Sequence, residues 1–380
     1  IRQPPRSARV ADKAICNSLA NTITGNAAAN ILNGGAGSDT MRGGAGDDTY
    51  VADVATDVVA ENAAEGVDLV QAAASWTLGA NVEDLTLTGA AAIDGTGNAL
   101  SNALAGNAAA NTLSGGDGND LAWGAAGNDT LAGGNGNDVL QGGDGNDAIG
   151  DAAGNNLLDG GIGADTLTGS SGREILIGGK GDDVIAAGAG ADVFAFNKGD
   201  GKDTIIATAG ADDTLSLGGG IRYAELGLRK IGNDLVLDAG ADQVTLKDWY
   251  EAAANHRMAQ LQVVTDASTD YLASSTDATR NRRVARFDFA KVVAGFDAAL
   301  ASNPSITRWT VADALAGAFV GSSDTAALGG DLAYGYGHSG TLSGIGFDAT
   351  GAILADANFA VTPQSLLPTS TLNAGPRLLR

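Results

Sequence analysis

The chain has 380 residues, of which 57 are glycine, 6 are proline and 5% are aromatic, and its formal net charge is −23. Such an acidic surface does not suit nucleic acid, which needs a basic face, but it suits divalent cations. With so few aromatic residues a large conventional core is not expected, and a repeat architecture fits better. The single cysteine, Cys16, excludes an internal disulfide.

The N-terminal segment gives no sign of a membrane anchor or a signal peptide. The chain begins at Ile1 rather than Met, so we expect a fragment or a processed product. Its first residues lack the apolar stretch of a signal peptide, and no apolar run reaches the roughly 18 residues of a membrane helix. Residues 1–16 are expected to form an N-terminal tail.

A nine-residue period begins near residue 17. Apolar residues recur at Ile23, Leu32, Met41 and Tyr50, and the residues two positions before them are Asn21, Asn30, Asp39 and Asp48. A sustained period of this kind predicts a solenoid. Asp57 follows Asp39 by two repeat units, so these two carboxylates are predicted to share a cation. Asp48 is predicted to lack an intact stacked partner.

Residues 51–100 form an irregular spacer in this period. Alternating apolar and polar residues predict strands at 67–71, 76–78 and 85–87. The phase returns at 89–113 with Asn102 and Asn111 where the repeat has Asp, and amide hydrogen bonds are expected to stack these turns without a metal. We expect residues 17–196 to form one long roll.

From Gly115 the pattern G-G-x-G-x-D-x-U-x, where U is a large apolar residue, runs without a gap. The U positions are Ala122, Leu131, Leu140, Ile149, Leu158, Leu167, Leu176, Ile185 and Phe194. The x-U-x residues predict a short strand with U pointing inward. Glycines at positions 1, 2 and 4 are expected to adopt positive φ and to let the loops stack closely. Two units make one turn of the solenoid, so each loop stacks on the loop two units away.

This stacking predicts calcium sites. Successive strands are about 4.8 Å apart, so carboxylates at position 6 lie near one another and repel. Ca²⁺ between them receives its six to eight oxygen ligands from carboxylates and turn carbonyls. The predicted ligands are the carboxylates of Asp39, Asp48, Asp57, Asp120, Asp129, Asp138, Asp147, Asp165, Asp183 and Asp192, and the turn glycines Gly116, Gly118, Gly134, Gly136, Gly143, Gly145, Gly161, Gly163, Gly179 and Gly181.

These units resemble the RTX (haemolysin-type calcium-binding) repeats of bacterial proteins exported by type I secretion. Residues 49–89 resemble a spacer common between RTX blocks. The resemblance implies a mainly β fold, a right-handed parallel β-roll solenoid that binds Ca²⁺. It also implies the C-terminal part of a large exported protein, with the type I secretion machinery as partner and an extracellular or cell-surface location.

The two faces of the roll are not equivalent in sequence. One carries Asp129, Asp147, Asp165 and Asp183, and the other carries Asp120, Asp138, Asn156, Glu174 and Asp192. Asn156 lacks a charge, and Glu174 is one methylene longer than Asp. Arg173 is expected to replace a cation by pairing with a neighbouring carboxylate. We therefore expect a continuous Ca²⁺ row on the Asp129 face and a broken row on the other.

Residues 197–255 are expected to cap the roll with β structure, and they resemble the segment that closes RTX rolls. Residues 197–203 predict a last irregular loop, and Asp212 and Asp213 precede a predicted strand at 214–217. Segments 235–237 and 244–246 predict a hairpin that ends in Trp249 and Tyr250, aromatic residues expected to cover an open β edge.

Helical periodicity replaces the glycine repeats after about residue 255. Phe287, Phe289, Val292, Val293, Phe296 and Leu300 suit one face of a helix that ends at Asn303–Pro304. Residues 310–313 predict a capping box for a helix to Val320. The glycine-rich stretch 324–346 is expected to be irregular after a short helix. Residues 256–380 are therefore expected to form a smaller mixed α/β domain, and they resemble the region of large RTX proteins that carries the export signal.

A search for catalytic residues gives none that we assign. The chain has two histidines, His256 and His338. Residues 337–340 do not match the G-x-S-x-G elbow and are expected to form a polar loop. His256 is expected in a surface turn, and Cys16 is expected to be a free thiol rather than a nucleophile. We expect no enzyme activity in this chain.

Two functions remain open from sequence. The first is an extracellular structural protein, such as an adhesin, a surface-layer protein or a matrix filament, that folds on Ca²⁺ after secretion and contacts itself or the cell surface. The second is the folding and export module of a secreted enzyme whose catalytic domain precedes Ile1. More repeats before Ile1 would favour the first function, and a catalytic motif there would favour the second.

Overall fold

The computed structural model describes residues 7–9, 13–206 and 212–372. The chain divides into two compact units, Ile1–Asp144 and Gly145–Arg380. The strands of the first unit are β1 (Ser7–Arg9), β2 (Lys13–Ile15), β3 (Thr22–Thr24), β4 (Ile31–Asn33), β5 (Thr40–Arg42), β6 (Thr49–Ala52), β7 (Val58–Val59), β8 (Leu69–Ala72), β9 (Trp76–Thr77), β10 (Asp84–Leu87), β11 (Gly95–Thr96), β12 (Ala103–Ala105), β13 (Thr112–Asp117), β14 (Leu121–Ala126), β15 (Thr130–Asn135) and β16 (Val139–Asp144).

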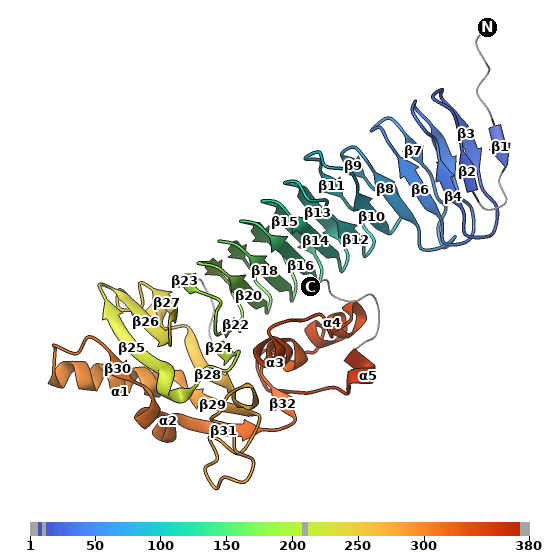
Figure 1. Cartoon of the computed structure of the whole chain (residues 1–380). Coiled ribbons are helices and arrows are strands. Elements are labelled where there is room, and N and C mark those ends of the chain that lie inside the picture. Colours follow the sequence, from blue (N-terminus) through green and yellow to red (C-terminus); the bar gives the residue numbers. More distant parts are fainter. Residues whose placement is uncertain (1–6, 10–12, 207–211, 373–380) are drawn as a thin grey trace. The chain divides into compact units, whose positions relative to one another are not determined.

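The first unit is a parallel β-roll whose strands stack as rungs (Figure 1). Its even-numbered strands form one parallel sheet from β2 to β16, and the odd-numbered strands form two shorter sheets, β1-β3-β5-β7 and β9-β11-β13-β15. Ile23 pairs with Met41 and Leu32 with Tyr50, and all four side chains are buried. The predicted parallel roll with inward U residues is therefore confirmed.

The spacer keeps the roll's core while its turn lengths change. β8, β9 and β10 lie close to the three strands predicted there. Tyr50 pairs with Val70, Val70 with Leu85 and Leu85 with Leu104, so the successive turns are longer, shorter and again longer than two repeat units. Because a buried apolar residue occupies the same register in every turn, the even-numbered sheet runs through the spacer. Only the odd-numbered side is interrupted.

The second unit begins with the same two-sheet arrangement and then changes to antiparallel strands. One sheet has the order β18-β20-β22-β24-β28-β29-β31 and the other β17-β19-β21-β23-β27-β26-β25-β30. Its strands are β17 (Ala148–Gly150), β18 (Leu157–Ile162), β19 (Thr166–Thr168), β20 (Ile175–Lys180), β21 (Val184–Ala186), β22 (Val193–Asn197), β23 (Lys202–Ile206), β24 (Asp213–Gly218), β25 (Leu226–Ile231), β26 (Asp234–Ala239), β27 (Asp242–Lys247), β28 (Met258–Val264), β29 (Val284–Asp288), β30 (Trp309–Thr310), β31 (Phe319–Ser323), β32 (Ala326–Ala327) and β33 (Gln364–Ser365).

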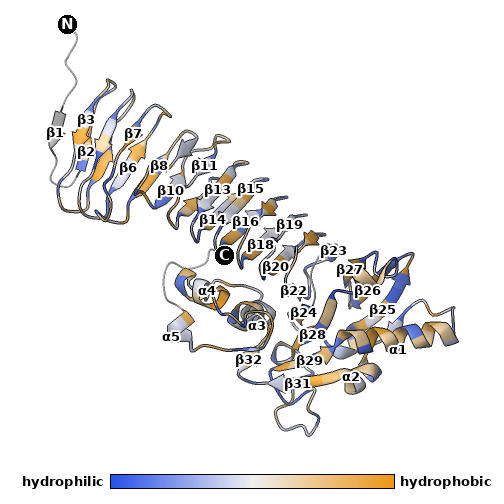
Figure 2. Cartoon of the chain, turned by 180° about the vertical axis from the view of Figure 1, so that it is seen from behind, coloured by the Kyte–Doolittle hydropathy of each residue, from blue (hydrophilic) through white to orange (hydrophobic). Residues whose placement is uncertain are grey.

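The hairpin predicted after the repeats is present as β26 and β27, with Leu235 opposite Leu246. It extends the roll rather than standing beside it, because β27 pairs in parallel with the repeat strand β23. Trp249 is buried against Phe289, edge to face, and His256 stacks on it at 4.5 Å between ring centroids. Hydrophobic residues (orange) mark the strands of the roll and the helix α1 in Figure 2.

The helices are α1 (Phe289–Ser302), α2 (Ala312–Ala318), α3 (Gly330–Ser339), α4 (Phe347–Leu354) and α5 (Thr369–Leu372), with short 3₁₀ turns η1 (Tyr223–Glu225), η2 (Ala253–Asn255) and η3 (Thr265–Ala267). α1 buries Phe289, Val292, Val293 and Phe296 of the predicted face, whereas Leu300 is half-buried and Phe287 belongs to β29. The predicted capping box of α2 is wrong, because its N-cap is Val311 and no side chain caps it.

The prediction of an irregular segment at 324–346 is also wrong, because this stretch contains α3. Glycines on both sides let α3 lie close to the roll, because a Cβ on Gly218 of β24 would lie 2.2 Å from Cα of Gly337 in α3. A Cβ on Gly329 would lie 3.2 Å from Ile175 and 3.4 Å from Val193, so the outward faces of β20 and β22 are buried under α3. Glycine here reflects close packing rather than disorder.

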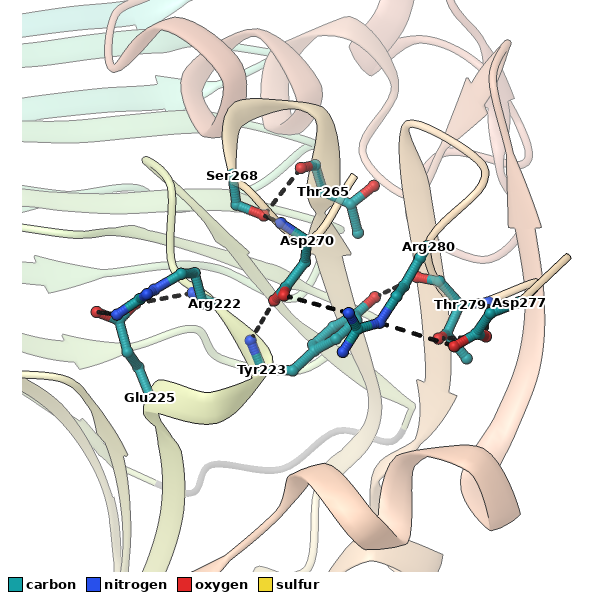
Figure 3. Close-up of polar contacts among 9 residues, drawn as sticks. All are labelled: Arg222, Tyr223, Glu225, Thr265, Ser268, Asp270, Asp277, Thr279 and Arg280. Carbon is teal, nitrogen blue, oxygen red and sulfur yellow. Dashed lines mark hydrogen bonds and ion pairs between the residues drawn. The ribbon is translucent and has the colours of Figure 1, made fainter. Parts of the chain in front are cut away.

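A polar network fixes the loop between β28 and β29 against η1 (Figure 3). The N–H of Tyr223 donates to Oδ2 of Asp270 at 2.6 Å, and the hydroxyl of Tyr223 donates to the carbonyl of Thr279. Arg280 lies 3.9 Å from Asp270 and 3.7 Å from Asp277. The loop that joins the two antiparallel strands is therefore held to the start of the β25 segment.

Candidate calcium sites

The position-6 carboxylates of the second unit form a ladder with the backbone. The N–H of Asp147 donates to Oδ1 of Asp165 at 2.8 Å, and the N–H of Asp165 to Oδ1 of Asp183 at 2.7 Å. The N–H of Asp183 donates to Oδ1 of Asp203 at 3.2 Å. All four residues are at most 3% exposed. These four residues are here named the Asp165 row. Asp147, Asp165 and Asp183 stack on loops two units apart as the repeat predicts, and Asp203, which the sequence did not predict, extends the ladder after a longer turn.

The first unit contains ladders of the same kind, with donor–acceptor distances between 2.6 Å and 2.9 Å. They run from Asn21 to Asp39 and Asp57, from Asn30 to Asp48, Asp68 and Glu83, from Asn102 to Asp120 and Asp138, and from Asn111 to Asp129. The side-chain amides of Asn102 and Asn111 donate to the carbonyls of Glu83 and Ile93. Amide stacking of these two turns is therefore confirmed.

The ladders leave a second carboxylate oxygen without a donor. Among the described residues, Oδ2 of Asp39, Asp48, Asp165 and Asp183 is buried and has no hydrogen-bond partner. A buried carboxylate oxygen without a donor is unfavourable. A calcium ion, which prefers hard oxygen ligands, would satisfy this oxygen, and the donor set of the repeats therefore fits Ca²⁺.

Glycine at position 1 of the repeat avoids a steric clash and does not provide the positive φ expected from the sequence. Positive φ is confined to positions 2 and 4, which include all ten glycines proposed as ligands: Gly116, Gly118, Gly134, Gly136, Gly143, Gly145, Gly161, Gly163, Gly179 and Gly181. At position 1, a Cβ on Gly160 would lie 2.4 Å from Oδ2 of Asp165, and one on Gly178 would lie 2.3 Å from Oδ2 of Asp183. The carboxylate therefore covers the space that a side chain at position 1 would need.

Burial and mutual repulsion raise the pKa values in the Asp165 row. Burial, together with the carboxylates of Asp183 and Asp147, raises the pKa of Asp165 to about 7. Burial raises the pKa of Asp183 to about 6. Burial and the Asp183 carboxylate raise the pKa of Asp203 to about 9. Without a cation, the ionised row is therefore destabilised in the folded chain.

The opposite row of the second unit consists of Asn156, Glu174, Asp192 and Asp213 and is here named the Glu174 row. The N–H of Glu174 donates to Oδ1 of Asp192, and the N–H of Asp192 to Oδ1 of Asp213. However, Nδ2 of Asn156 donates to Asp151, and the hydroxyl of Ser170 donates to Oε1 of Glu174, both at 2.7 Å. Oε2 of Glu174 is still buried without a donor among the described residues. Side-chain donors thus occupy part of the oxygens in this row.

Arg173 does not have the partner expected from the sequence. Its guanidinium donates to the carbonyl of Ala357 at 2.8 Å, and not to a neighbouring carboxylate of the described chain. Nδ2 of Asn155 donates to the carbonyl of Leu354 at 2.8 Å. The loops of the Glu174 row therefore bind the end of α4 and the residues after it. The loops of the Asp165 row present carboxylates instead.

The spacer contributes carboxylates that the sequence analysis missed. Asp48 was expected to lack a stacked partner, but its N–H donates to Oδ1 of Asp68 at 2.8 Å. One oxygen each of Asp48, Glu61 and Asp68 lies within 4.8 Å of the other two. Asp68 follows Asp48 by more than two repeat units, so a search at the exact repeat spacing does not pair these two carboxylates. Asp57 does stack on Asp39 as predicted, with an N–O distance of 2.9 Å.

The residues considered for catalysis lie in ordered elements. Residues 337–339 belong to the end of α3 rather than to a polar loop. Nδ1 of His338 lies 3.3 Å from Oδ1 of Asp266, while the hydroxyl of Ser339 donates to the carbonyls of Gly335 and Thr341. Ser339 is therefore not activated by its neighbour. His256 is exposed at the end of η2, as expected.

A family model described as RTX calcium-binding nonapeptide repeat (4 copies) matches residues 17–50, 96–131, 123–150, 141–173 and 168–201. This chain carries RTX calcium-binding repeats. No curated protein matches the chain. The RTX matches cover most of the turns in which the buried ladders lie. Asp57, Asp68 and Glu83 fall in the spacer between the first two matches, and Asp203 and Asp213 follow the last match. The cofactor of these repeats is Ca²⁺, and the RTX family is linked to type I secretion.

The coarse function follows from the repeat and its fold. RTX repeats that form a β-roll make this a calcium-binding protein with a structural, non-catalytic fold in that region. Within the ranges that the structure describes, no helix is both long and apolar enough to cross a membrane.

Proposed function

We propose that this chain is an extracellular structural protein, of the adhesin, surface-layer or matrix type, whose roll folds on Ca²⁺ after type I export. The proposed ion ligands are Asp39, Asp48, Asp57, Asp120, Asp129, Asp138, Asp147, Asp165, Asp183 and Asp192, together with the carbonyls of the turn glycines. The observation that carries the proposal is the buried Oδ2 of Asp39, Asp165 and Asp183, which has no donor in the described chain.

The same geometry supports a calcium switch. Without the ion, each turn adds a desolvated carboxylate next to another, and the glycine-rich chain buries little apolar surface to offset its conformational entropy. Millimolar Ca²⁺ outside a cell matches the affinity of extracellular modules, about 10⁻⁴–10⁻³ M. Because an ion that binds only the folded state stabilises that state, binding free energy becomes folding free energy.

The packing of the chain supports a structural role rather than chemistry. His338 and Ser339 do not contact each other's reactive atoms, and His256 stacks on Trp249. The parallel strands end in polar loops, and each repeat strand buries at least its U residue. Such a repeat presents a regular surface for a second copy or for the cell surface.

The test is light scattering with size-exclusion chromatography of the chain in EDTA and then in millimolar Ca²⁺. We expect an expanded monomer in EDTA that compacts in Ca²⁺ and then assembles. Compaction without assembly would favour an export and folding module of a secreted enzyme. An unchanged hydrodynamic radius would contradict the calcium-dependent folding itself.

A further inference from the structure

We propose that Asp48, Glu61 and Asp68 form a calcium site of their own, here named the spacer site, which ties the irregular spacer to the N-terminal repeats. Glu61 and Asp68 lie outside every matched RTX segment, so the nonapeptide pattern does not assign this site. The inference rests on the proposed function only in that the chain meets millimolar Ca²⁺.

The three carboxylates converge because each is anchored by a backbone N–H. The N–H of Asn30 donates to Oδ1 of Asp48 at 2.6 Å, and the N–H of Asp48 donates to Oδ1 of Asp68 at 2.8 Å. The N–H of Gly43 donates to Oε1 of Glu61 at 2.9 Å. One oxygen from each of the three carboxylates lies within 4.8 Å of the other two. Calcium–oxygen distances of about 2.3–2.6 Å allow such a separation around one ion.

One oxygen is directed into this group and has no donor. Asp48 is 1% exposed, and its Oδ2 is buried without a hydrogen-bond partner in the described part of the chain. This oxygen lies beside Gly43, 1.8 Å from the place of a Cβ there. Gly43 is also the residue whose N–H holds Glu61. The unpaired oxygen of Asp48 and the carboxylate of Glu61 therefore meet at the same glycine.

The surroundings offer room for water ligands. A cavity of about 200 Å³ reaches the spacer site at Glu61, and its lining includes Arg42, Gly43 and Glu65 but neither Asp48 nor Asp68. Three carboxylates supply three negative charges but fewer than the six to eight oxygens that Ca²⁺ takes. Water in this cavity can complete the shell, and the cavity gives the ion a path to solvent. Three carboxylates with water suit a hard divalent cation rather than a soft metal.

The spacer site explains why the spacer follows the repeat ladder although its turns have irregular lengths. Asp68 directly precedes β8, one long turn after Asp48, and Glu61 lies before it in the loop between β7 and β8. Without the ion, the carboxylates of Glu61 and Asp68 repel that of Asp48, so the loop is pushed away from the last repeat. With the ion, the loop is joined to the last complete repeat of the N-terminal block.

The experiment compares the full-length chain with Glu61→Gln and Asp68→Asn. Both substitutions keep the oxygen that accepts the backbone N–H, and both remove one charge. The matched control is Asp94→Asn, an exposed spacer carboxylate whose Oδ1 accepts the N–H of Thr112 at 2.9 Å. Equilibrium dialysis with ⁴⁵Ca counts bound ions, and hydrogen exchange follows residues 58–72 and the repeat turns separately.

We expect Glu61→Gln and Asp68→Asn to bind one ion fewer per chain at about 1 mM Ca²⁺, the upper end of the affinity range of extracellular modules. We also expect them to lose calcium-dependent protection at residues 58–72 while the later repeat turns keep theirs. Asp94→Asn should behave as the unmodified chain. Unchanged ion counts and unchanged protection in both variants would overturn the spacer site while leaving the proposed function intact. If the unmodified chain itself bound no Ca²⁺, the proposed function would fail together with the spacer site.

Discussion

The two rows of the second unit show what a repeat turn does with a buried carboxylate. In the Asp165 row, Oδ2 of Asp165 and Asp183 has no protein donor in the described chain. In the Glu174 row, Ser170 donates to Glu174 and the amide of Asn156 donates to Asp151. The loops of the second row also hold the carbonyls of Leu354 and Ala357. Both rows keep a buried carboxylate oxygen without a donor in the described chain, but the Glu174 row also receives a side-chain donor and holds the C-terminal segment, so we propose that the Asp165 row is the stronger cation site.

Neutralising the Asp165 row should have the largest effect. In Asp165→Asn with Asp183→Asn, the backbone contacts to Oδ1 persist but two ionised ligands are lost. Contacts to charged groups contribute about 1.5–3 kcal/mol each, so the Ca²⁺ midpoint of folding should rise by at least about 100-fold. Circular dichroism during a Ca²⁺ titration measures this midpoint.

The matched variant is Glu174→Gln with Asp192→Asn. Burial raises the pKa of both carboxylates, and the Glu174 carboxylate raises that of Asp192 further. Only Asp192 of this pair is a proposed ion ligand, so removing both charges should stabilise the chain in EDTA and shift the Ca²⁺ midpoint by less than the loss of Asp165 and Asp183 does. Equal midpoint shifts in the two double variants would mean that both rows bind ions, and the asymmetry would be wrong.

The pH dependence of the calcium-free chain should follow the raised pKa values. The pKa values of Asp183, Asp165 and Asp203 in the folded state are about 6, 7 and 9, above the unfolded value of about 4. The folded state binds more protons, so its stability is fully present below pH ~4 and is lost as pH rises through these values. In EDTA, circular dichroism should therefore show the largest folded fraction at about pH 4 and a falling fraction as the pH rises to about 9, which agrees with an expanded chain at neutral pH. In Ca²⁺ the trend should reverse, because ligands must be deprotonated. A chain in EDTA that gains stability with rising pH would contradict this account.

The rows also differ at position 1 of the repeat. Gly178 lies under Oδ2 of Asp183, whereas the corresponding residue before Asp192 is Ala187, which is buried. Gly178→Ala should displace the Asp183 carboxylate at a cost of about 1–3 kcal/mol and raise the Ca²⁺ midpoint. The reverse change, Ala187→Gly, should cost about 1 kcal/mol or less and leave the midpoint unchanged. A Ca²⁺ titration of both variants decides the point, and a normal midpoint for Gly178→Ala would refute the steric argument.

The sequence predicts the features of this protein that depend on contacts between neighbouring repeat units, and it misses those that depend on contacts between distant residues. The period of nine predicts the parallel roll, the buried U residues and the stacked carboxylates, because each turn repeats the same short-range constraints. It misses Glu61 and Asp68, since their relation to Asp48 depends on a turn that is longer than two repeat units. It also misses α3, because glycine favours an irregular segment locally, whereas here the glycines allow close packing on the roll, as between Gly218 and Gly337. The partner of Arg173 is a carbonyl far along the chain, in Ala357, beyond any local pattern.

The smallest effect is expected where the helix α3 meets the end of the repeats. The hydroxyl of Tyr336 donates to Oδ2 of Asp200 at 3.0 Å, and Nδ2 of Asn197 donates to the carbonyl of Tyr336 at 2.8 Å. Tyr336→Phe removes only the first contact, so we expect a loss of about 1 kcal/mol and faster proteolysis of residues 330–372. Tyr334→Phe is the control, because its hydroxyl contacts Asp266 and not the roll. If Tyr336→Phe is cleaved no faster than this control, the hydroxyl contact does not hold α3 on the roll. The apolar packing of α3 on β22 and β24 and the amide of Asn197 would then be sufficient.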